Sequence, residues 1–122
     1  MSALFTPYRL GSLELRNRIV IAPMCQYSAQ KIPVGPSYQV PLARAVKAAT
    51  NLPTVAVGLI AGYDQAEAIV GTGDADFVAL ARTILYDPRW PWHAAAHLGA
   101  TVKAPKQYLR SQPSRHRHLF ED

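Results

Sequence analysis

Two side chains that could take part in catalysis or binding follow a short apolar run near the amino terminus. Residues 19–22 read Ile-Val-Ile-Ala, a pattern typical of a strand buried on both faces of a parallel sheet. Pro23 ends the run, since proline has no N–H to donate to a sheet, and Cys25 and Tyr27 come soon after it. A thiol there could hydrogen-bond to a bound redox ring and a phenol to a bound carbonyl, although a lone cysteine near a strand end is more often a packed apolar residue.

A second set of candidate residues follows two further apolar runs. Residues 54–60 and 75–80 are both apolar enough to be buried parallel strands. A glycine near the end of the first run would let the backbone approach a ligand, because glycine has no Cβ. An arginine after the second run could bind a phosphate beside backbone donors, or could be salt-bridged at the sheet edge. The residues of this candidate anion site are Gly58, Leu59, Ala81 and Arg82.

Helices are predicted between and after these runs. The first begins at Pro41 and runs to Thr50, because proline suits the first position of a helix. A helix over 64–70 joins the two runs into a β-α-β unit, a helical turn covers 83–86, and a last helix covers 91–98. The apolar face of the first helix, which we expect to pack on the sheet, consists of Leu42, Ala45, Val46 and Ala49.

Composition and length place the chain among globular proteins. It has 122 residues, of which 49% are hydrophobic and 17% charged, so it can bury a core and is unlike disordered chains. No run approaches the roughly 18 apolar residues of a membrane span, and no signal peptide is evident, so we expect a cytoplasmic protein without membrane contact. Cys25 is the sole cysteine, which excludes an intramolecular disulfide. Residues 4–10 and 13–17 are predicted to form a hairpin across Gly11-Ser12.

The excess of positive charge gathers in the last residues. Thirteen basic against eight acidic residues give a formal charge of +5, and arginines and histidines crowd residues 110–118. This segment is interpreted as a solvated or oligomer-contacting tail; the alternative is a polyanion-binding segment, but no nucleic-acid reading motif accompanies it. His93 and His97 have the four-residue spacing of a shared metal site, yet no acidic or cysteine partner is evident, so no metal is expected. Trp90 and Trp92 are predicted to anchor the last helix by packing.

Taken together, these segments resemble a known family. Residues 17–29, with Pro-Met-Cys-Gln-Tyr at 23–27, resemble the first barrel strand of the old yellow enzyme family of FMN-dependent ene-reductases, especially its cysteine-containing second group. Residues 32–41 and onward to Gln107-Tyr-Leu-Arg110 look like the end of the same barrel. The resemblance therefore covers nearly the whole chain, but only the two ends of the family pattern.

The resemblance implies an α/β fold that is a partial TIM barrel. A complete barrel takes about 250 residues, and the segments for strands 2–6 have no counterpart here. The runs at 19–22, 54–60 and 75–80 would be barrel strands 1, 7 and 8, which are neighbours in a closed barrel. We therefore expect a small parallel sheet of about three strands, with outer helices and an N-terminal β-hairpin. Residues 1–104 form this partial FMN-binding barrel, with a seam near 30–31, and residues 105–122 form a basic C-terminal tail.

The resemblance also implies a function and roles for particular residues. Family members use NADPH or NADH and FMN to reduce the C=C bond of α,β-unsaturated carbonyls. By resemblance, Cys25 and Tyr27 act at the flavin ring and the substrate, and Arg110 reaches the active site of a neighbouring subunit. The backbone of Pro23 and Met24 would line the flavin, and Gly58, Leu59, Ala81 and Arg82 would hold the FMN phosphate.

The missing strands limit the activity that the resemblance implies. They carry the carbonyl-gripping pair and the usual proton donor of the family, so the first hypothesis is an impaired oxidoreductase completed by other chains. The alternative is a catalytically inactive fragment that binds FMN weakly or associates with other chains. Uncovered sheet edges predict an oligomer or a complementing chain as partner, beside an enone substrate.

Overall fold

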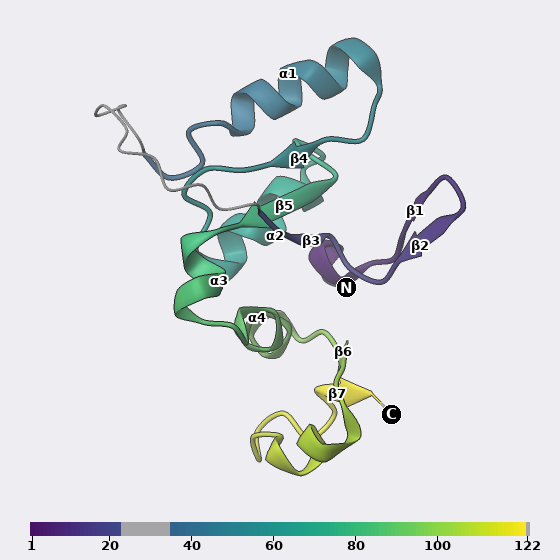
Figure 1. The fold of residues 1–122 in the computed structure, drawn as a ribbon, viewed down its shortest axis with the longest axis vertical. Coiled ribbons are helices and arrows are strands. Elements are labelled where there is room, and N and C mark those ends of the chain that lie inside the picture. Colours follow the sequence, from purple (N-terminus) through teal and green to yellow (C-terminus); the bar gives the residue numbers. More distant parts are fainter. Residues whose placement is uncertain (23–34, 122) are drawn as a thin grey trace.

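A small parallel sheet forms the centre of the fold. The computed structural model describes residues 1–22 and 35–121. Within them, β3 (Ile19–Ile21), β5 (Phe77–Leu80) and β4 (Val55–Ala56) form a three-stranded sheet in the order β3-β5-β4 (Figure 1). Both pairings are parallel, with Ile19 opposite Val78 and Val55 opposite Phe77. This order confirms the predicted neighbourhood of the first and last runs. The described residues form an open sheet and not a closed barrel.

The strand β3 is more exposed than its sequence predicts. The run at 19–22 has the pattern of a strand buried on both faces, but Val20 is 36% and Ile21 is 65% exposed. The prediction of burial on both faces is wrong because β3 is an edge strand, and no described segment covers these two side chains. By contrast, all residues of the central strand β5 are buried. Burial in this sheet therefore follows position in the sheet more closely than apolar character.

Helices follow the strands much as predicted, with bounds that differ by a residue or two. The helices are α1 (Val40–Thr50), α2 (Tyr63–Gly71), α3 (Arg82–Tyr86) and α4 (Trp90–Leu98). Asn51 and Gly99, both in the left-handed conformation, end α1 and α4. The helix α2 connects β4 to β5, which is the predicted β-α-β unit. The strand β4 is much shorter than the predicted run 54–60, because the chain leaves the sheet near Gly58, whose φ is +108°.

The helix α1 packs through a different face from the predicted one. Leu42 and Val46 are 66% and 52% exposed, so the predicted apolar face points away from the sheet. The residues turned inward include Val40 and Lys47, whose ammonium lies 3.0 Å from a carboxylate oxygen of Asp76 on the sheet side. The prediction is wrong because this ion pair, together with buried Val40, sets the rotation of the helix. Figure 1 shows α1 at one end of the molecule, beside β4.

The predicted hairpin exists but starts later than expected. The strands β1 (Tyr8–Leu10) and β2 (Leu13–Leu15) pair antiparallel across Gly11, whose φ of +61° suits the turn. Residues before them form the 3₁₀ helix η1 (Ala3–Phe5) instead of a strand. This helix is anchored because the Glu67 carboxylate accepts hydrogen bonds from the N–H groups of Ala3 and Leu4 and from the Ser2 hydroxyl. Leu4 is thereby fully buried in the core.

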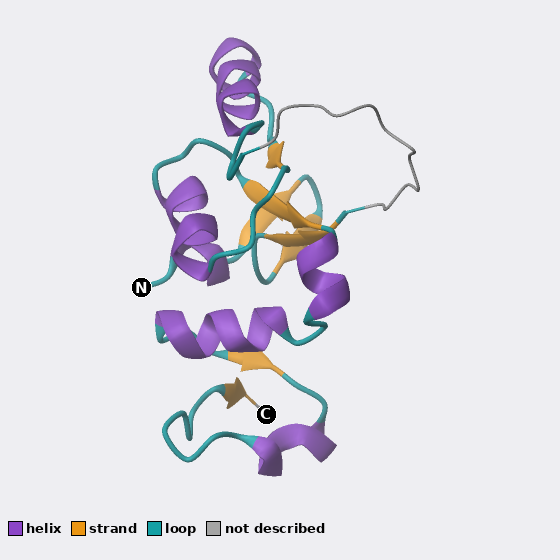
Figure 2. Cartoon of the chain, turned by 90° about the vertical axis from the view of Figure 1, so that its left-hand side faces the viewer, coloured by secondary structure: helices purple, strands orange, loops and turns teal. Residues whose placement is uncertain are grey.

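The C-terminal segment carries structure of its own. It contains β6 (Val102–Lys103), the 3₁₀ helix η2 (Lys106–Ser111) and β7 (Phe120–Glu121), with β6 and β7 in parallel pairing. Trp92 of α4 packs edge-on against the rings of Tyr108 and Phe120, while Trp90 is buried in the main core, as predicted for both tryptophans. Figure 2 shows this unit below α4, apart from the three-stranded sheet. None of the helices in the described ranges is long and apolar enough to cross a bilayer.

Candidate functional site

A small cavity lies where β4 and β5 end. Its volume is about 150 Å³, and both strands point their carboxyl ends toward it, since they run parallel and the residues that follow each of them line it. Ligands of α/β sheets generally bind outside the carboxyl ends of the strands. The lining brings together all four predicted anion-site residues, Gly58, Leu59, Ala81 and Arg82. The other lining residues are Tyr38, Val57, Ile60, Ala79 and Thr83.

The loop that follows β4 is held by side chains from three helices. The carbonyl oxygen of Leu59 accepts a hydrogen bond from the Gln65 amide of α2 at 3.1 Å. The next two carbonyl oxygens accept from the Thr83 hydroxyl of α3 at 3.1 Å and from the Trp90 indole N–H of α4 at 2.9 Å. Three successive carbonyl groups are therefore tied to α2, α3 and α4. This network fixes the backbone of residues 59–61 against the rest of the fold.

The N–H groups of the same loop are available to a ligand. Among the described residues, no hydrogen bond uses the backbone N–H of Gly58, Leu59 or Ile60. Buried or half-buried N–H groups normally find an acceptor, and successive N–H donors in a tight turn form anion-binding concavities. Leu59 adopts a φ of +48°, a conformation that non-glycine residues rarely hold outside turns and ligand-binding sites. The loop can therefore donate to an anion seated in the cavity.

The side chain of Tyr38 packs against the backbone of Gly58. A Cβ built at this position would stand 2.6 Å from Cε1 of Tyr38, which is closer than any tolerated contact. The φ of +108° independently requires glycine here. Sequence reasoning assigned the missing Cβ to the approach of a ligand, whereas in the structure the Tyr38 ring occupies that space. Tyr38 is consequently a wall of the cavity that the sequence did not predict.

Arg82 supplies the positive charge of the cavity. It is the first residue of α3, separated from β5 by Ala81, and its side chain is exposed. The alternative of a salt-bridged arginine at the sheet edge finds no support, because no salt bridge within residues 1–22 and 35–121 involves Arg82. An unpaired guanidinium beside free backbone donors is suited to phosphate, which it can bind with two parallel hydrogen bonds.

The other predicted site residues lie apart from this cavity or outside the description. Pro23, Met24, Cys25 and Tyr27 fall outside the described residues, so their predicted roles stay predictions. Arg110 is exposed in η2, within the C-terminal unit that Figure 1 draws at the opposite end of the molecule from α1. Its predicted role in a neighbouring subunit also stays a prediction.

The two histidines of α4 each have an acidic partner, which corrects the expectation that none lies nearby. Nδ1 of His93 lies 2.7 Å from Asp87, and Nε2 of His97 lies 3.0 Å from Asp64. The two pairs are separate, and the described residues contain no cluster of three or more His, Cys, Asp or Glu side chains that could hold a metal. Tyr63 stacks beside His97, and burial, followed by the charge of Asp87, raises the pKa of its phenol.

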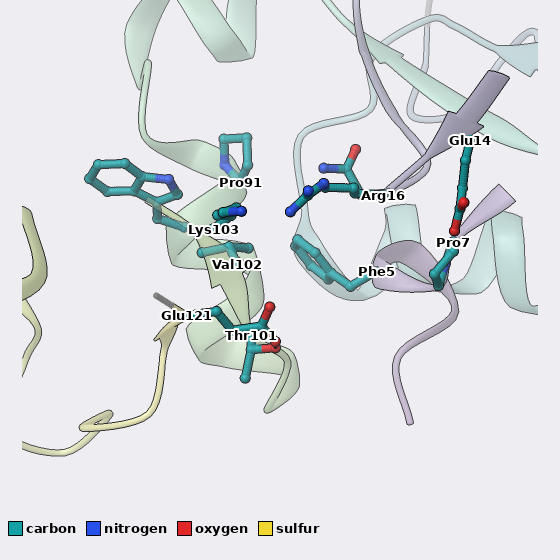
Figure 3. A pocket seen from close by; sticks show the side chains of 11 residues that line it. Phe5, Pro7, Glu14, Arg16, Pro91, Thr101, Val102, Lys103 and Glu121 are labelled. Carbon is teal, nitrogen blue, oxygen red and sulfur yellow. The ribbon is translucent and has the colours of Figure 1, made fainter. Parts of the chain in front are cut away.

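A larger cavity of about 690 Å³ lies elsewhere, between the N-terminal hairpin region and the C-terminal unit. Figure 3 shows Phe5 and Arg16 on one side of it and Val102 and Lys103 on the other, with the two cationic head groups directed toward each other. Its lining includes Arg16, which precedes β3, so it lies toward the amino ends of the strands. In parallel α/β folds the residues at the amino ends of the strands contribute to stability, and the active site lies at the other end. The charges of the carboxylates and cationic side chains that line this cavity also cancel. The smaller cavity is therefore the better candidate site.

Known proteins share much of the sequence of this chain. The sequence pattern of the NADH:flavin oxidoreductase / NADH oxidase family matches residues 30–100, which include the loop after β4 and Arg82. An NADPH dehydrogenase of Halalkalibacterium halodurans is 49% identical over 80 residues, which are 66% of this chain and 24% of that protein. One from a Geobacillus species is 50% identical over 80 residues, with the same coverage.

A third relative matches more of the chain at lower identity. The NADPH dehydrogenase of Listeria monocytogenes is 34% identical over 119 residues, covering 87% of this chain and 35% of that protein. The chain thus spans only 24% to 35% of the length of these curated relatives. The activities of the whole relatives cannot be transferred to it directly.

Proposed function

We infer the function from descent: this chain belongs to the NADH:flavin oxidoreductase / NADH oxidase family, and we propose that it binds FMN through the phosphate. The observation that carries the proposal is the cavity in which the loop after β4 and Arg82 meet. A cationic side chain and free N–H donors at the carboxyl ends of parallel strands favour an anionic group.

The residues present fit one part of FMN and not the whole. A cavity of about 150 Å³ is smaller than the roughly 300–1,000 Å³ of complete small-molecule sites, so it suits a phosphate group. The isoalloxazine ring would have to lie outside it. Ala81, where glycine would permit a closer approach, narrows the cavity on the side of β5. We therefore assign the cavity to the phosphate alone.

When bound, FMN would supply hydride transfer from NADPH or NADH to an α,β-unsaturated carbonyl. The part of this chain is to hold the phosphate: Arg82 balances its charge, and the N–H groups of Gly58 and Leu59 donate to its oxygens. The carbonyl groups of that loop are already occupied by Gln65, Thr83 and Trp90, so the loop does not have to rearrange to bind. We propose Cys25 and Tyr27 for the ring and the substrate carbonyl.

Reduction of the C=C bond would need residues from another chain, because the carbonyl-gripping pair of the family has no counterpart here. A second copy of this chain has the same sequence and cannot supply that pair, so the reduction would need a different chain. Separately, we propose that a second copy of this chain covers the open edges of the sheet. All strands of the sheet are parallel and its two edges differ, so β3 of one copy can pair with β4 of the next in the same direction. Exposed apolar side chains flank both edges: Val20, Ile21, Val55 and Val57.

A two-part experiment tests the proposal. The purified protein is mixed with FMN, freed of excess by gel filtration, and its visible absorption recorded; NADPH oxidation is then followed with 2-cyclohexenone, against FMN without protein. Retained flavin with faster NADPH oxidation supports an active oxidoreductase. Retained flavin without faster oxidation supports the alternative of an inactive FMN-binding fragment. If no flavin is retained and titration shows no binding, the proposal is refuted.

A further inference from the structure

We propose that Gln65 is a positioning residue that joins the two walls of the anion cavity and sets the distance between them. The proposal rests on the proposed function, since it concerns the same cavity. Gln65 lies on α2 and does not line the cavity itself. It acts through the loop after β4 on one side and the segment that carries Tyr38 on the other.

The contacts of this one amide reach both segments. Its Nε2 donates to the Ser37 hydroxyl at 2.7 Å and to the Leu59 carbonyl oxygen at 3.1 Å. Its Oε1 accepts from the N–H groups of Ala61 at 3.0 Å and Gly62 at 3.2 Å. A side-chain amide has two donors and can accept two hydrogen bonds, so its capacity is filled. Ser37 precedes Tyr38 directly, and residues 59–62 continue from Gly58.

The two segments need such a tie because both hold unfavourable backbone conformations. Ser37 and Leu59 have φ values of +59° and +48°, although neither is glycine. A non-glycine residue in the left-handed region costs of the order of 1 kcal/mol, and it persists only where surrounding contacts determine it. Gln65 contacts both residues. Without it, we expect the Tyr38 ring to leave Gly58 and the cavity to lose its shape.

A purely structural role for Gln65 would be helix capping, and the two roles can be separated. Its oxygen satisfies the N–H of Gly62, the residue before α2, as in a capping box. Glutamate caps equally well through the same oxygen and suits a helix N-terminus. A glutamate cannot donate to the Leu59 carbonyl oxygen, although its carboxylate can accept from the Ser37 hydroxyl. Gln65→Glu therefore keeps the cap and breaks the link at Leu59, whereas Ser37→Ala breaks it at Ser37.

The experiment compares Gln65→Glu and Ser37→Ala with the wild type. Ser37→Ala breaks the link at its other end without introducing charge, so it controls for repulsion between a carboxylate and FMN. Gln112→Glu is the matched control, because the Gln112 amide also donates to a carbonyl, that of Leu109, and accepts from an N–H, that of Phe120, in the C-terminal unit. The measurements are amide hydrogen exchange of the FMN-free protein, urea unfolding, and the Kd for FMN from quenching of flavin fluorescence.

We expect exchange in residues 37–39 to rise about fivefold in Ser37→Ala, which corresponds to about 1 kcal/mol of lost local stability, and to rise less in Gln65→Glu. The Kd for FMN should rise about three- to tenfold in both variants, with little change in the urea midpoint. Gln112→Glu should alter neither the exchange in residues 37–39 nor the Kd for FMN. Unchanged exchange in residues 37–39, or an unchanged Kd beside a wild type that binds FMN, would overturn the role of Gln65. A wild type that does not bind FMN would instead refute the proposed function, and exchange alone would then decide whether Gln65 joins the two segments.

Discussion

Ile19 and Val78 stand opposite each other in the parallel pairing of β3 with β5. Among the described residues, α1, β4 and α2 lie between them in sequence, yet this pairing brings the N-terminal strand beside the strand that precedes Arg82. The strand β3 therefore ends at the same edge of the sheet as β5, since parallel strands share their carboxyl edge.

Replacing Val78 tests whether the central strand holds the sheet together. Val78 is 0% exposed and belongs to the main core, so Val78→Ala should lower the free energy of unfolding by about 2 kcal/mol. Val20 on the neighbouring strand is 36% exposed, and Val20→Ala should cost clearly less, about 0.5 kcal/mol. Urea unfolding followed by circular dichroism measures both. Equal losses would contradict the arrangement with β5 in the centre.

The Glu67 carboxylate predicts a pH dependence of stability. Burial raises its pKa, but the hydrogen bonds from Leu4, Ser2 and Ala3 and the charge of the N-terminus outweigh burial, so the pKa in the folded state is lowered. The stabilisation that the ionised Glu67 carboxylate gives to the folded state is then present above the unfolded pKa of about 4.3. It is lost as the pH falls through the lower pKa of the folded state. Glu67→Gln should cost about 1 kcal/mol at pH 7 and flatten the stability curve below about pH 5.

Urea midpoints between pH 7 and pH 3 measure this effect. Glu14→Gln serves as the control, because Glu14 lies exposed in the hairpin and its side chain makes no hydrogen bond or ion pair within the described ranges. That variant should follow the wild-type curve. A Glu67→Gln protein whose stability falls with acid as steeply as that of the wild type would show that the anchoring of η1 does not depend on this charge.

The exposed face of α1 predicts association between chains. Leu42 and Val46 are 66% and 52% exposed on adjacent turns, beside the open edge of β4. Exposed apolar patches of this kind mark interaction surfaces. Leu42→Ser with Val46→Ser should shift the sedimentation coefficient toward the monomer at micromolar concentration and change the free energy of unfolding by less than about 0.5 kcal/mol. A monomeric wild type, or an oligomer that this double substitution leaves intact, would contradict a role of this face of α1 in association.

Much of the sheet could be predicted from the sequence alone. Short apolar runs mark the three strands, and the resemblance to a closed barrel gives their order, because the first and last strands of a barrel are neighbours. The rotation of α1 could not be predicted this way. Its apolar periodicity selects Leu42 and Val46, but an ion pair between Lys47 and Asp76, distant in sequence, turns the helix to another face.

The candidate site was predicted only in part, for a similar reason. Gly58 and Arg82 follow strands that end at one edge of the sheet, so barrel geometry alone places them together. Tyr38 and Gln65 gave no local signal, since their roles arise from contacts between segments far apart in the sequence: Tyr38 packs on Gly58, and Gln65 binds Ser37. The positive φ of Leu59, which follows Gly58, marks the loop in the structure. A leucine in the sequence gives no sign of such a backbone conformation.

The most direct test of the central claim compares FMN with riboflavin, which lacks the phosphate, as ligands of the wild type and of Arg82→Gln. If the cavity holds the phosphate, the wild type should bind FMN about tenfold more tightly than riboflavin, as expected for a charge-assisted hydrogen bond at an exposed arginine. Arg82→Gln should remove most of that difference while leaving the Kd for riboflavin unchanged, and Arg115→Gln, in the C-terminal unit, should retain it. Equal affinity of the wild type for the two flavins, or a preference for FMN that survives in Arg82→Gln, would contradict the assignment of the cavity to the phosphate.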